Sequence, residues 1–187
     1  MDKLRAYVFI DSAQLRAGLS AIGADWKTLN LRTLADVALQ CCDNRWMNEQ
    51  IAVGRVFVYD GVLEGEEGEN SDVEAWLVRN ESQRETIVRR GATLAMDPRN
   101  PKRLTQKGVD VQLAVDALSA AQRGVFEVMI LVSGDGDFVP VVEAVRAAGP
   151  LVCVASMRDK LNPYLERAAD RVGWLPNDPD AWKGWHL

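Results

Sequence analysis

Two aspartates that follow an apolar strand give the first indication of chemistry in this sequence. Val128–Val132 is typical of a buried parallel strand, and Asp135 and Asp137 come directly after it, with glycine before and between them. Ligands of an open α/β sheet bind at the carboxyl ends of its strands. Two carboxylates at such an end can hold a hard divalent cation through oxygen. The alternative is that the glycines make a turn and Asp137 only caps the following helix.

A second apolar run ends in an acid in the same way. Residues 6–10 form a short, β-prone segment that stops at Asp11, and a helical pattern with Leu15 and Leu19 follows. A single aspartate at a strand end can be only a helix cap. Because two strands end in acids, capping alone is a weaker explanation, and we predict that Asp11 belongs to the same site.

Asp110 is expected at the same edge of the sheet. It lies in the first turn of the helix that precedes Val128–Val132, and in a βαβ unit such a helix begins where the strands end. Asp116 is six residues further on, about 9 Å along the helix axis at 1.5 Å per residue, and it does not return to the same helix face. We therefore predict that Asp116 has a structural role or supports the site indirectly.

Charge is unevenly distributed along the chain. Residues 60–74 carry seven acids and no basic residue, which favours a solvated loop. Residues 84–107 are mainly basic, and four side chains there are candidates for contacting phosphates: Arg99, Lys102, Arg103 and Lys107. The net charge of −5 argues against a broad coat for nucleic acid, but a local basic patch can hold phosphates. A plain charged surface explains the same composition equally well.

The overall composition is that of a soluble cytoplasmic protein. The chain has 187 residues, 48% hydrophobic and 26% charged. No apolar stretch in the sequence approaches the length of a membrane span, and we expect no signal peptide at its N-terminus. Cys41, Cys42 and Cys153 are odd in number and lack a CxxC spacing, so we expect reduced thiols. The single histidine is His186, which argues against histidine-based catalysis and a histidine-rich metal site.

Apolar runs alternate with helical patterns along the chain, which predicts a mostly parallel sheet with right-handed crossovers. Strands are expected near 5–10, 51–59, 92–95, 127–132, 150–155 and, at an edge, 171–175. Helical patterns occupy 29–41, 73–88, 109–118 and 138–145. We expect one domain over 1–175 and an irregular tail over 176–187.

Taken together, these segments resemble NYN domains, specifically the LabA-like group of PIN-like nucleases, over about residues 5–175. The matching pieces are Val8-Phe9-Ile10-Asp11, Tyr59-Asp60, Lys107-Gly108-Val109-Asp110 through Asp116, Ser133-Gly134-Asp135-Gly136-Asp137-Phe138 and, more weakly, 165–170. The resemblance implies a three-layer α/β/α sandwich with a mostly parallel central sheet. It also implies a metal-dependent ribonuclease whose substrate is RNA, as single strands. The implied catalytic ligands of Mg²⁺ or Mn²⁺ are Asp11, Asp110, Asp135 and Asp137.

One position departs from the family pattern. The family usually has Asn three residues after the first Asp, whereas this chain has Gln14, which keeps the amide but is longer by a methylene. We predict that Gln14 and Ser133 support the site, with Ser133 orienting an acid by a hydrogen bond. Gln14 also favours the alternative, a weakly active or inactive NYN module that binds RNA or a protein partner, including a second copy of the chain.

Other acid-based sites fit less well. A haloacid-dehalogenase-type phosphatase needs a second Asp two residues after the first, where this chain has Ala13. A response-regulator receiver needs an acid pair at the first strand, and a Toprim nuclease normally has Glu there, whereas this strand ends in Asp11 alone. An EF-hand needs further ligands and a Glu at the end of its loop.

Overall fold

A six-stranded sheet forms the centre of the molecule, with the order β3-β2-β1-β6-β7-β8 and every neighbouring pair parallel. The computed structural model describes residues 3–42, 51–61, 69–91, 93–97 and 100–185, and the side chains of these residues except 69–70 and 93–107. The strands of the sheet are β1 (Leu4–Asp11), β2 (Ile51–Gly61), β3 (Thr86–Gly91), β6 (Val128–Val132), β7 (Leu151–Ser156) and β8 (Arg171–Trp174).

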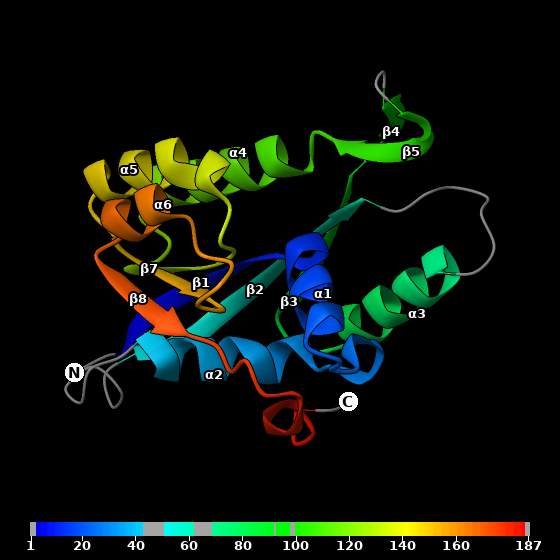
Figure 1. Cartoon of the computed structure of the whole chain (residues 1–187). Helices are drawn as coiled ribbons and strands as arrows, with labels where there is room; N and C mark the ends of the chain where they lie inside the picture. Colours follow the sequence, from blue (N-terminus) through cyan, green and yellow to red (C-terminus); the bar gives the residue numbers. More distant parts are fainter. Residues whose placement is uncertain (1–2, 43–50, 62–68, 92, 98–99, 186–187) are drawn as a thin grey trace.

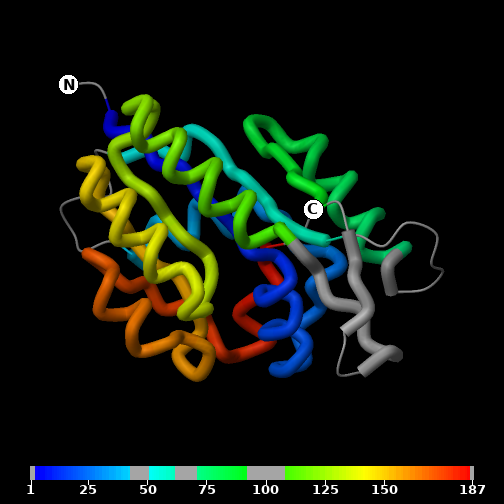
Figure 2. Tube along the Cα trace, turned by 90° about the horizontal axis from the view of Figure 1, so that it is seen from above, coloured from blue at the N-terminus to red at the C-terminus, as the bar shows by residue number. Residues whose placement is uncertain are grey.

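Helices cover both faces of this sheet (Figure 1). One layer consists of α1 (Ser12–Ala21), α2 (Leu31–Cys42) and α3 (Glu69–Glu81), together with the 3₁₀ turn η1 (Trp26–Thr28). The other consists of α4 (Val109–Gln122), α5 (Val139–Ala147) and α6 (Pro163–Ala168), and α4 and α5 lie side by side in Figure 2. The predicted three-layer α/β/α sandwich is confirmed.

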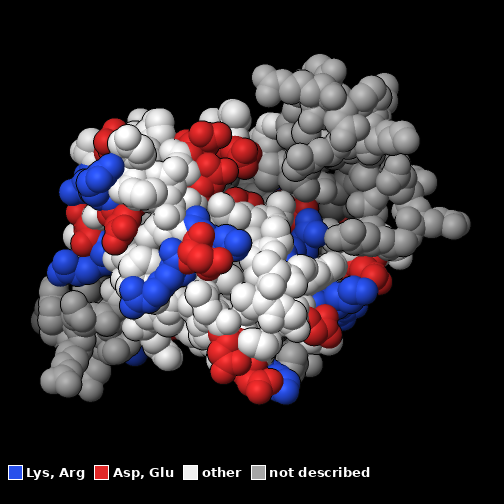
Figure 3. Space-filling view, viewed as in Figure 1, with Lys and Arg blue, Asp and Glu red and all other residues white. Residues whose placement is uncertain are grey.

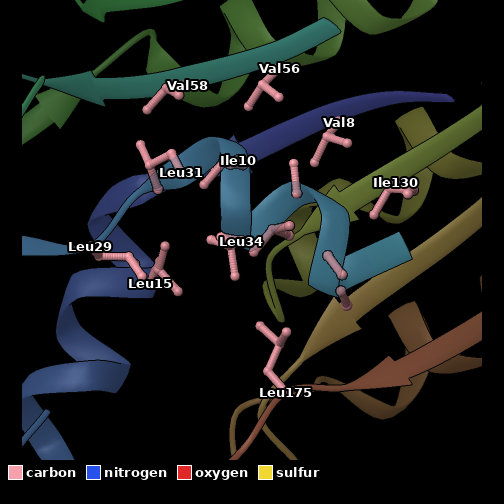
Figure 4. Packing of buried hydrophobic residues seen from close by; sticks show 14 of the residues in the cluster. Val8, Ile10, Leu15, Leu29, Leu31, Leu34, Val56, Val58, Ile130 and Leu175 are labelled. Carbon is pink, nitrogen blue, oxygen red and sulfur yellow. The ribbon is translucent and has the colours of Figure 1, made fainter. Parts of the chain in front are cut away.

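Both faces of the central strands are buried, which explains why these strands read as continuous apolar runs. Val8 and Ile10 of β1 point toward Leu31 and Leu34 of α2 (Figure 4), and all four are fully buried. Phe9, between them in sequence, points to the opposite face, where its ring lies 5.1 Å from that of Phe57. Because successive side chains of β1 point to opposite faces of the sheet, this one strand packs against both helical layers.

The strand order reverses beside β1. The chain runs from β1 outward to β2 and β3 on one side, and later from β6 outward to β7 and β8 on the other. The connections that leave β1 and β6 therefore diverge to opposite faces of the sheet. In an open α/β sheet, this switch point leaves a crevice at the carboxyl ends of the two strands, where ligands bind.

One predicted element is wrong in extent, and another is present but lies outside the main sheet. The helical pattern at 73–88 is a helix only to Glu81, after which Glu85 has a φ of 62° and Ile87 and Val88 belong to β3. The run Thr86-Ile87-Val88 is β-branched, and pairing with β2 overrides the helical spacing. The strand predicted at 92–95 is present as β4 (Thr93–Asp97), but it pairs antiparallel with β5 (Asn100–Lys107) in a separate two-stranded sheet.

The acidic segment 60–74 is not simply a solvated loop. Asp60 is fully buried at the end of β2, and Asp72 and Glu74 lie on α3. Residues 62–68 of the segment lie outside the described part of the chain. Segment 176–187, expected as an irregular tail, contains the 3₁₀ turn η3 (Pro179–Trp182), and Trp182 is buried as part of the hydrophobic core.

The cysteines and the helix lengths complete the description. Cys41, Cys42 and Cys153 all lie in described ranges and are not joined in a disulfide. Among the helices that the structure describes, none combines the length and the apolar character that crossing a lipid bilayer requires.

Candidate functional site

The structure places the predicted acids at the switch-point rim of the sheet. Asp11 is the last residue of β1, and Ser133 is the first residue after β6. Asp135 caps the 3₁₀ turn η2 (Gly136–Phe138), and Asp137 is exposed within that turn. Asp110 lies in the first turn of α4, after Gly108, whose φ of 85° is a left-handed conformation that favours glycine.

Asp11 is held from two sides. Its Oδ1 accepts a hydrogen bond from Gln14 N at 3.1 Å, which caps α1, and its Oδ2 accepts one from Ser133 Oγ at 3.2 Å. Burial raises the pKa of Asp11 to about 6, and the charges of Asp110 and Asp135 add to this shift. The two hydrogen bonds oppose it. Asp11 is thus a helix cap, and its carboxylate still has lone pairs for a further partner.

Asp110 is coupled electrostatically to the same group. Partial removal from water raises its pKa, and the charges of Asp135 and Asp137 raise it further. Asp135 also raises the pKa of Asp11, so each of these acids acts on at least one other across the rim. The alternative from the sequence was that Asp137 only caps a helix. In the structure the capping residue is Asp135, whose Oδ1 accepts a hydrogen bond from Asp137 N at 3.0 Å.

Ser133 and Gln14 connect these acids through hydrogen bonds. Ser133 Oγ lies 3.0 Å from Gln14 Oε1 and 3.2 Å from Asp11 Oδ2, and it accepts a hydrogen bond from Asp135 N at 3.1 Å. Gln14 Oε1 also accepts a short hydrogen bond from Gly134 N. The longer side chain of glutamine therefore reaches the turn after β6 and fixes it relative to β1.

A buried ion pair fixes α1 from its other side. Arg16 donates to both carboxylate oxygens of Asp60, with distances of 2.9–3.1 Å, and Asp60 has no exposed surface. Ser12 Oγ contacts Asp60 Oδ2 at 2.5 Å and the carbonyl oxygen of Tyr59 at 2.9 Å. Removing one partner of a buried ion pair typically costs about 3–5 kcal/mol in the free energy of unfolding. We therefore assign Asp60 a structural role: its pairing with Arg16 positions α1, the helix that carries Gln14.

The glycines of the acidic turn are explained by close approach of another loop. A Cβ at Gly136 would lie 2.5 Å from Asn162 Nδ2, and one at Gly134 would overlap the carbonyl of Lys160. Neither glycine has a positive φ, so the reason for glycine here is space and not backbone conformation. Asn162 N also donates to Gly134 O at 2.9 Å. The loop after β7 is thereby attached directly to the turn that carries Asp135.

Asp116 lies apart from the rim acids. Its Oδ2 accepts hydrogen bonds from Tyr59 Oη at 3.0 Å and from Arg89 Nε at 3.2 Å. Burial, together with the charge of Asp116, raises the pKa of the Tyr59 hydroxyl above its ordinary value. These contacts join α4 to β2 and β3, which favours the structural role among the two that the sequence allowed.

The side chains of the four candidate RNA-contacting residues lie outside the described part of the structure. Arg99 lies outside the described residues. Lys102, Arg103 and Lys107 belong to β5, but their side chains lie outside the described part. Their role remains a prediction from the sequence.

Sequence reasoning missed the loop after β7. Lys160, Asn162 and Tyr164 follow a strand that neighbours β6, and parallel neighbours end at the same rim, so this position was the available signal. An open depression of about 440 Å³ lies there, lined by Asp135, Asp137, Val139, Pro140, Asn162 and Tyr164. A separate pocket beside Gln14 and Ser133 measures only about 20 Å³ and has room for about one water molecule.

The chemistry of the four acids fits a divalent cation better than their spacing does. All four donors are carboxylates, the ligands that Mg²⁺ and Mn²⁺ prefer. Among the described residues, no three acid, histidine or cysteine side chains lie close enough to form a metal cage. Mg²⁺ commonly keeps several waters and binds through one or two carboxylates, so an open set of this kind fits it.

Comparison with known proteins identifies the family. Residues 5–175 match the NYN domain, and the chain belongs to that family, whose members are generally nucleases. The crystal structure of a protein of unknown function from Vibrio parahaemolyticus is similar, with a TM-score of 0.65 and 16% sequence identity over 99% of this chain and 97% of that chain. At that identity the similarity concerns the fold alone. No curated protein matches the sequence.

Proposed function

We propose that this protein is a metal-dependent ribonuclease of the LabA-like group, which hydrolyses phosphodiester bonds of single-stranded RNA. The observation that carries the proposal is that Asp11 ends β1 and Asp135 follows β6, the two strands at the switch point of the sheet, with Asp110 in the first turn of α4. The raised pKa values of Asp11 and Asp110, to which the neighbouring acids contribute, agree with this arrangement. Neighbouring acids raise one another's pKa, and a bound cation relieves their repulsion. Membership of the NYN family supports the same reaction class.

Two groups of residues would have different roles in hydrolysis: one holds the cation and the other positions the acids. Asp11, Asp110, Asp135 and Asp137 would hold Mg²⁺ or Mn²⁺. The bound cation would supply charge neutralisation at the phosphate and activation of a water for attack. Gln14 and Ser133 keep the turn with Asp135 in register with Asp11. Ser133 is an orienting residue, because its oxygen is buried and is bonded on both sides.

The direct test is incubation of the purified protein with labelled single-stranded RNA in Mn²⁺, in Mg²⁺ and in EDTA. We expect cleavage with either metal and none in EDTA. Asp135→Asn keeps an oxygen that can cap η2 but removes the charge, and its cleavage rate should fall at least about 100-fold. Asp25→Asn is the matched control, because Asp25 is an exposed cap of η1 remote in sequence from the rim acids. Equal rates for the two variants would refute the assignment.

A binding module without catalysis is the second candidate. It is favoured by the open spacing of the acids in the described residues and by Gln14 in place of the usual Asn. RNA binding that persists while no cleavage occurs in Mn²⁺ would select this candidate. Cleavage that depends on Asp135 would exclude it.

We also propose that the basic stretch contributes phosphate contacts and that the protein is cytoplasmic. Neutralising one of Arg99, Lys102, Arg103 or Lys107 should make the salt dependence of RNA binding shallower, by about 0.7 in log–log slope per contact. An unchanged slope in both Arg103→Ala and Lys107→Ala would remove the stretch from the RNA-contacting surface. The reduced cysteines support the cytoplasmic location.

A further inference from the structure

Tyr164 is an aromatic side chain that the fold leaves in water. It is 69% exposed, the highest exposure of any large apolar side chain in the described part of the chain. It lies at the start of α6, and the guanidinium carbon of Arg167 lies over the ring, 4.7 Å from its centroid. This contact leaves the ring exposed, so packing of the core does not explain the tyrosine.

The backbone at Tyr164 is fixed in position relative to the acidic turn. Asn162 Oδ1 accepts from Tyr164 N at 2.8 Å and caps α6, while Asn162 N donates to Gly134 O at 2.9 Å. Asn162 also packs against Gly136, where a Cβ would not fit. One residue therefore links the start of α6 to both sides of Asp135. Tyr164 and Asp135 line the same open depression of about 440 Å³, a volume within the range of small-ligand sites.

Two basic side chains of the loop after β7, in the part of the chain whose side chains are described, already have partners. Lys160 is paired with Asp159 at 3.3 Å, and Arg158 lies over the ring of Trp174, 4.4 Å from its centroid. On the face shown in Figure 3, Lys and Arg form several separate groups beside Asp and Glu, without a continuous basic surface among the described residues. Beside a cluster of acids, a contact that does not depend on phosphate charge is the more useful one.

We propose that Tyr164 is a stacking platform for one nucleobase of single-stranded RNA, next to the site of cleavage, with Arg167 supporting the ring. The inference rests on the proposed function, because it takes RNA as the ligand. Every base has a π-face, so such a contact is tolerant of sequence. Bases inside a duplex are already stacked on one another, and the platform therefore selects unpaired strands.

The test measures binding of a short fluorescein-labelled oligouridylate to Asp135→Asn in EDTA, so that cleavage does not interfere. Adding Tyr164→Ala should weaken binding about 5- to 100-fold, the range of one base–aromatic stack. Tyr164→Phe keeps the ring and should stay within about 2-fold. Tyr164→Leu keeps apolar surface without the ring and should resemble Tyr164→Ala. The exposed position of the side chain means that all three variants should keep the parent melting temperature.

A second probe separates stacking from a general loss of affinity. An oligonucleotide with the same backbone but abasic sugars should bind Tyr164→Ala and its parent equally, because it has no base to stack. Equal affinity of Tyr164→Ala and its parent for oligouridylate, with metal-dependent cleavage by the wild type intact, would overturn the platform and leave the ribonuclease standing. Loss of self-association in Tyr164→Ala with unchanged RNA affinity would assign the ring to a protein interface and also overturn it. If the wild type neither bound nor cleaved RNA, both the platform and the ribonuclease would be overturned.

Discussion

Ser133 Oγ and Gln14 Oε1 lie 3.0 Å apart and join the turn after β6 to the first turn of α1. The same amide oxygen accepts from Gly134 N, and Ser133 Oγ accepts from Asp135 N. The two strands at the switch point are thus connected by one side chain at the level of the acids. The extra methylene of glutamine, which in sequence is a departure from the family pattern, supplies the reach for this connection.

Gln14→Asn should therefore destabilise the protein. The shorter side chain cannot reach both donors, and an unsatisfied Gly134 N–H, together with the lost bond to Ser133, should cost about 1–3 kcal/mol in the free energy of unfolding. Urea denaturation measures this loss. RNA affinity should stay nearly constant because no charge changes, whereas turnover should fall because the turn that carries Asp135 loses its anchor.

Gln40→Asn is the control for this experiment. Gln40 is exposed on α2, so its substitution reports only the lower helix propensity of asparagine, a few tenths of a kcal/mol. Equal destabilisation by the two substitutions would show that the amide of Gln14 does not anchor the turn. A rise in turnover in Gln14→Asn would show that glutamine restrains the reaction.

Asp11 makes the stability of the metal-free protein dependent on pH. Its pKa is about 6 in the folded protein and about 3.9 when unfolded, so between these values the folded state binds more protons. Stability should fall as the pH rises from about 4 to 6 and then level off. Asp11→Asn, which retains the helix cap, should be more stable than wild type by about 1–3 kcal/mol at pH 8 in EDTA, with the difference vanishing near pH 4.

Asp25→Asn tests whether this pH dependence of stability arises from the acids at the rim. Asp25 also caps a helical turn, accepting from Lys27 N at 3.0 Å, but it is exposed. Its substitution should change stability by a similar small amount at both pH values. If Asp11→Asn behaved in the same way, without a larger gain at pH 8, the attribution of the raised Asp11 pKa to burial and neighbouring acids would be wrong.

The part of the site that could be predicted from sequence is the part that follows strand ends. Asp11 and Asp135 were found because β1 and β6 read as apolar runs that stop at acids. Asn162 and Tyr164 also follow a strand end, but they were missed because neither is an acid and their contact with the acidic turn depends on two crossover loops that meet in space. The error at Ile87 has another cause, since a helical spacing of apolar residues there conflicts with β-branched side chains, and pairing with β2 decides between them.

Asp116 should prove structural when it is changed. Tyr59→Phe removes the hydroxyl that donates to Asp116 and should cost about 1 kcal/mol. Asp116→Ala leaves that hydroxyl without its partner and should cost about 1–3 kcal/mol. The double variant should be less destabilised than the sum of the two, which a double-mutant cycle measures. Turnover per folded molecule should stay the same; a loss of about 10-fold or more in Asp116→Ala would bring Asp116 into the site.

Divalent cations should stabilise the fold through the rim acids. A ligand that binds only the folded state at about ten times its Kd adds about 1.4 kcal/mol, which for a chain of this size raises Tm by about 3–5 °C. We expect such a rise for the wild type in Mn²⁺ and in Mg²⁺, measured by differential scanning fluorimetry. Asp135→Asn should melt at a higher temperature than wild type in EDTA, because it removes a charge that acts on both Asp11 and Asp110.

The same variant should respond less to metal, because one oxygen ligand has lost its charge. Asp25→Asn should shift in Mn²⁺ as the wild type does, since it leaves the rim unchanged. Ca²⁺ provides a further comparison, because it also takes oxygen ligands but prefers about six to eight of them. An open set of carboxylates should therefore favour Mg²⁺ over Ca²⁺ more than a closed cage would. An unchanged melting curve for the wild type in millimolar Mn²⁺ would mean that the four acids do not form a specific cation site.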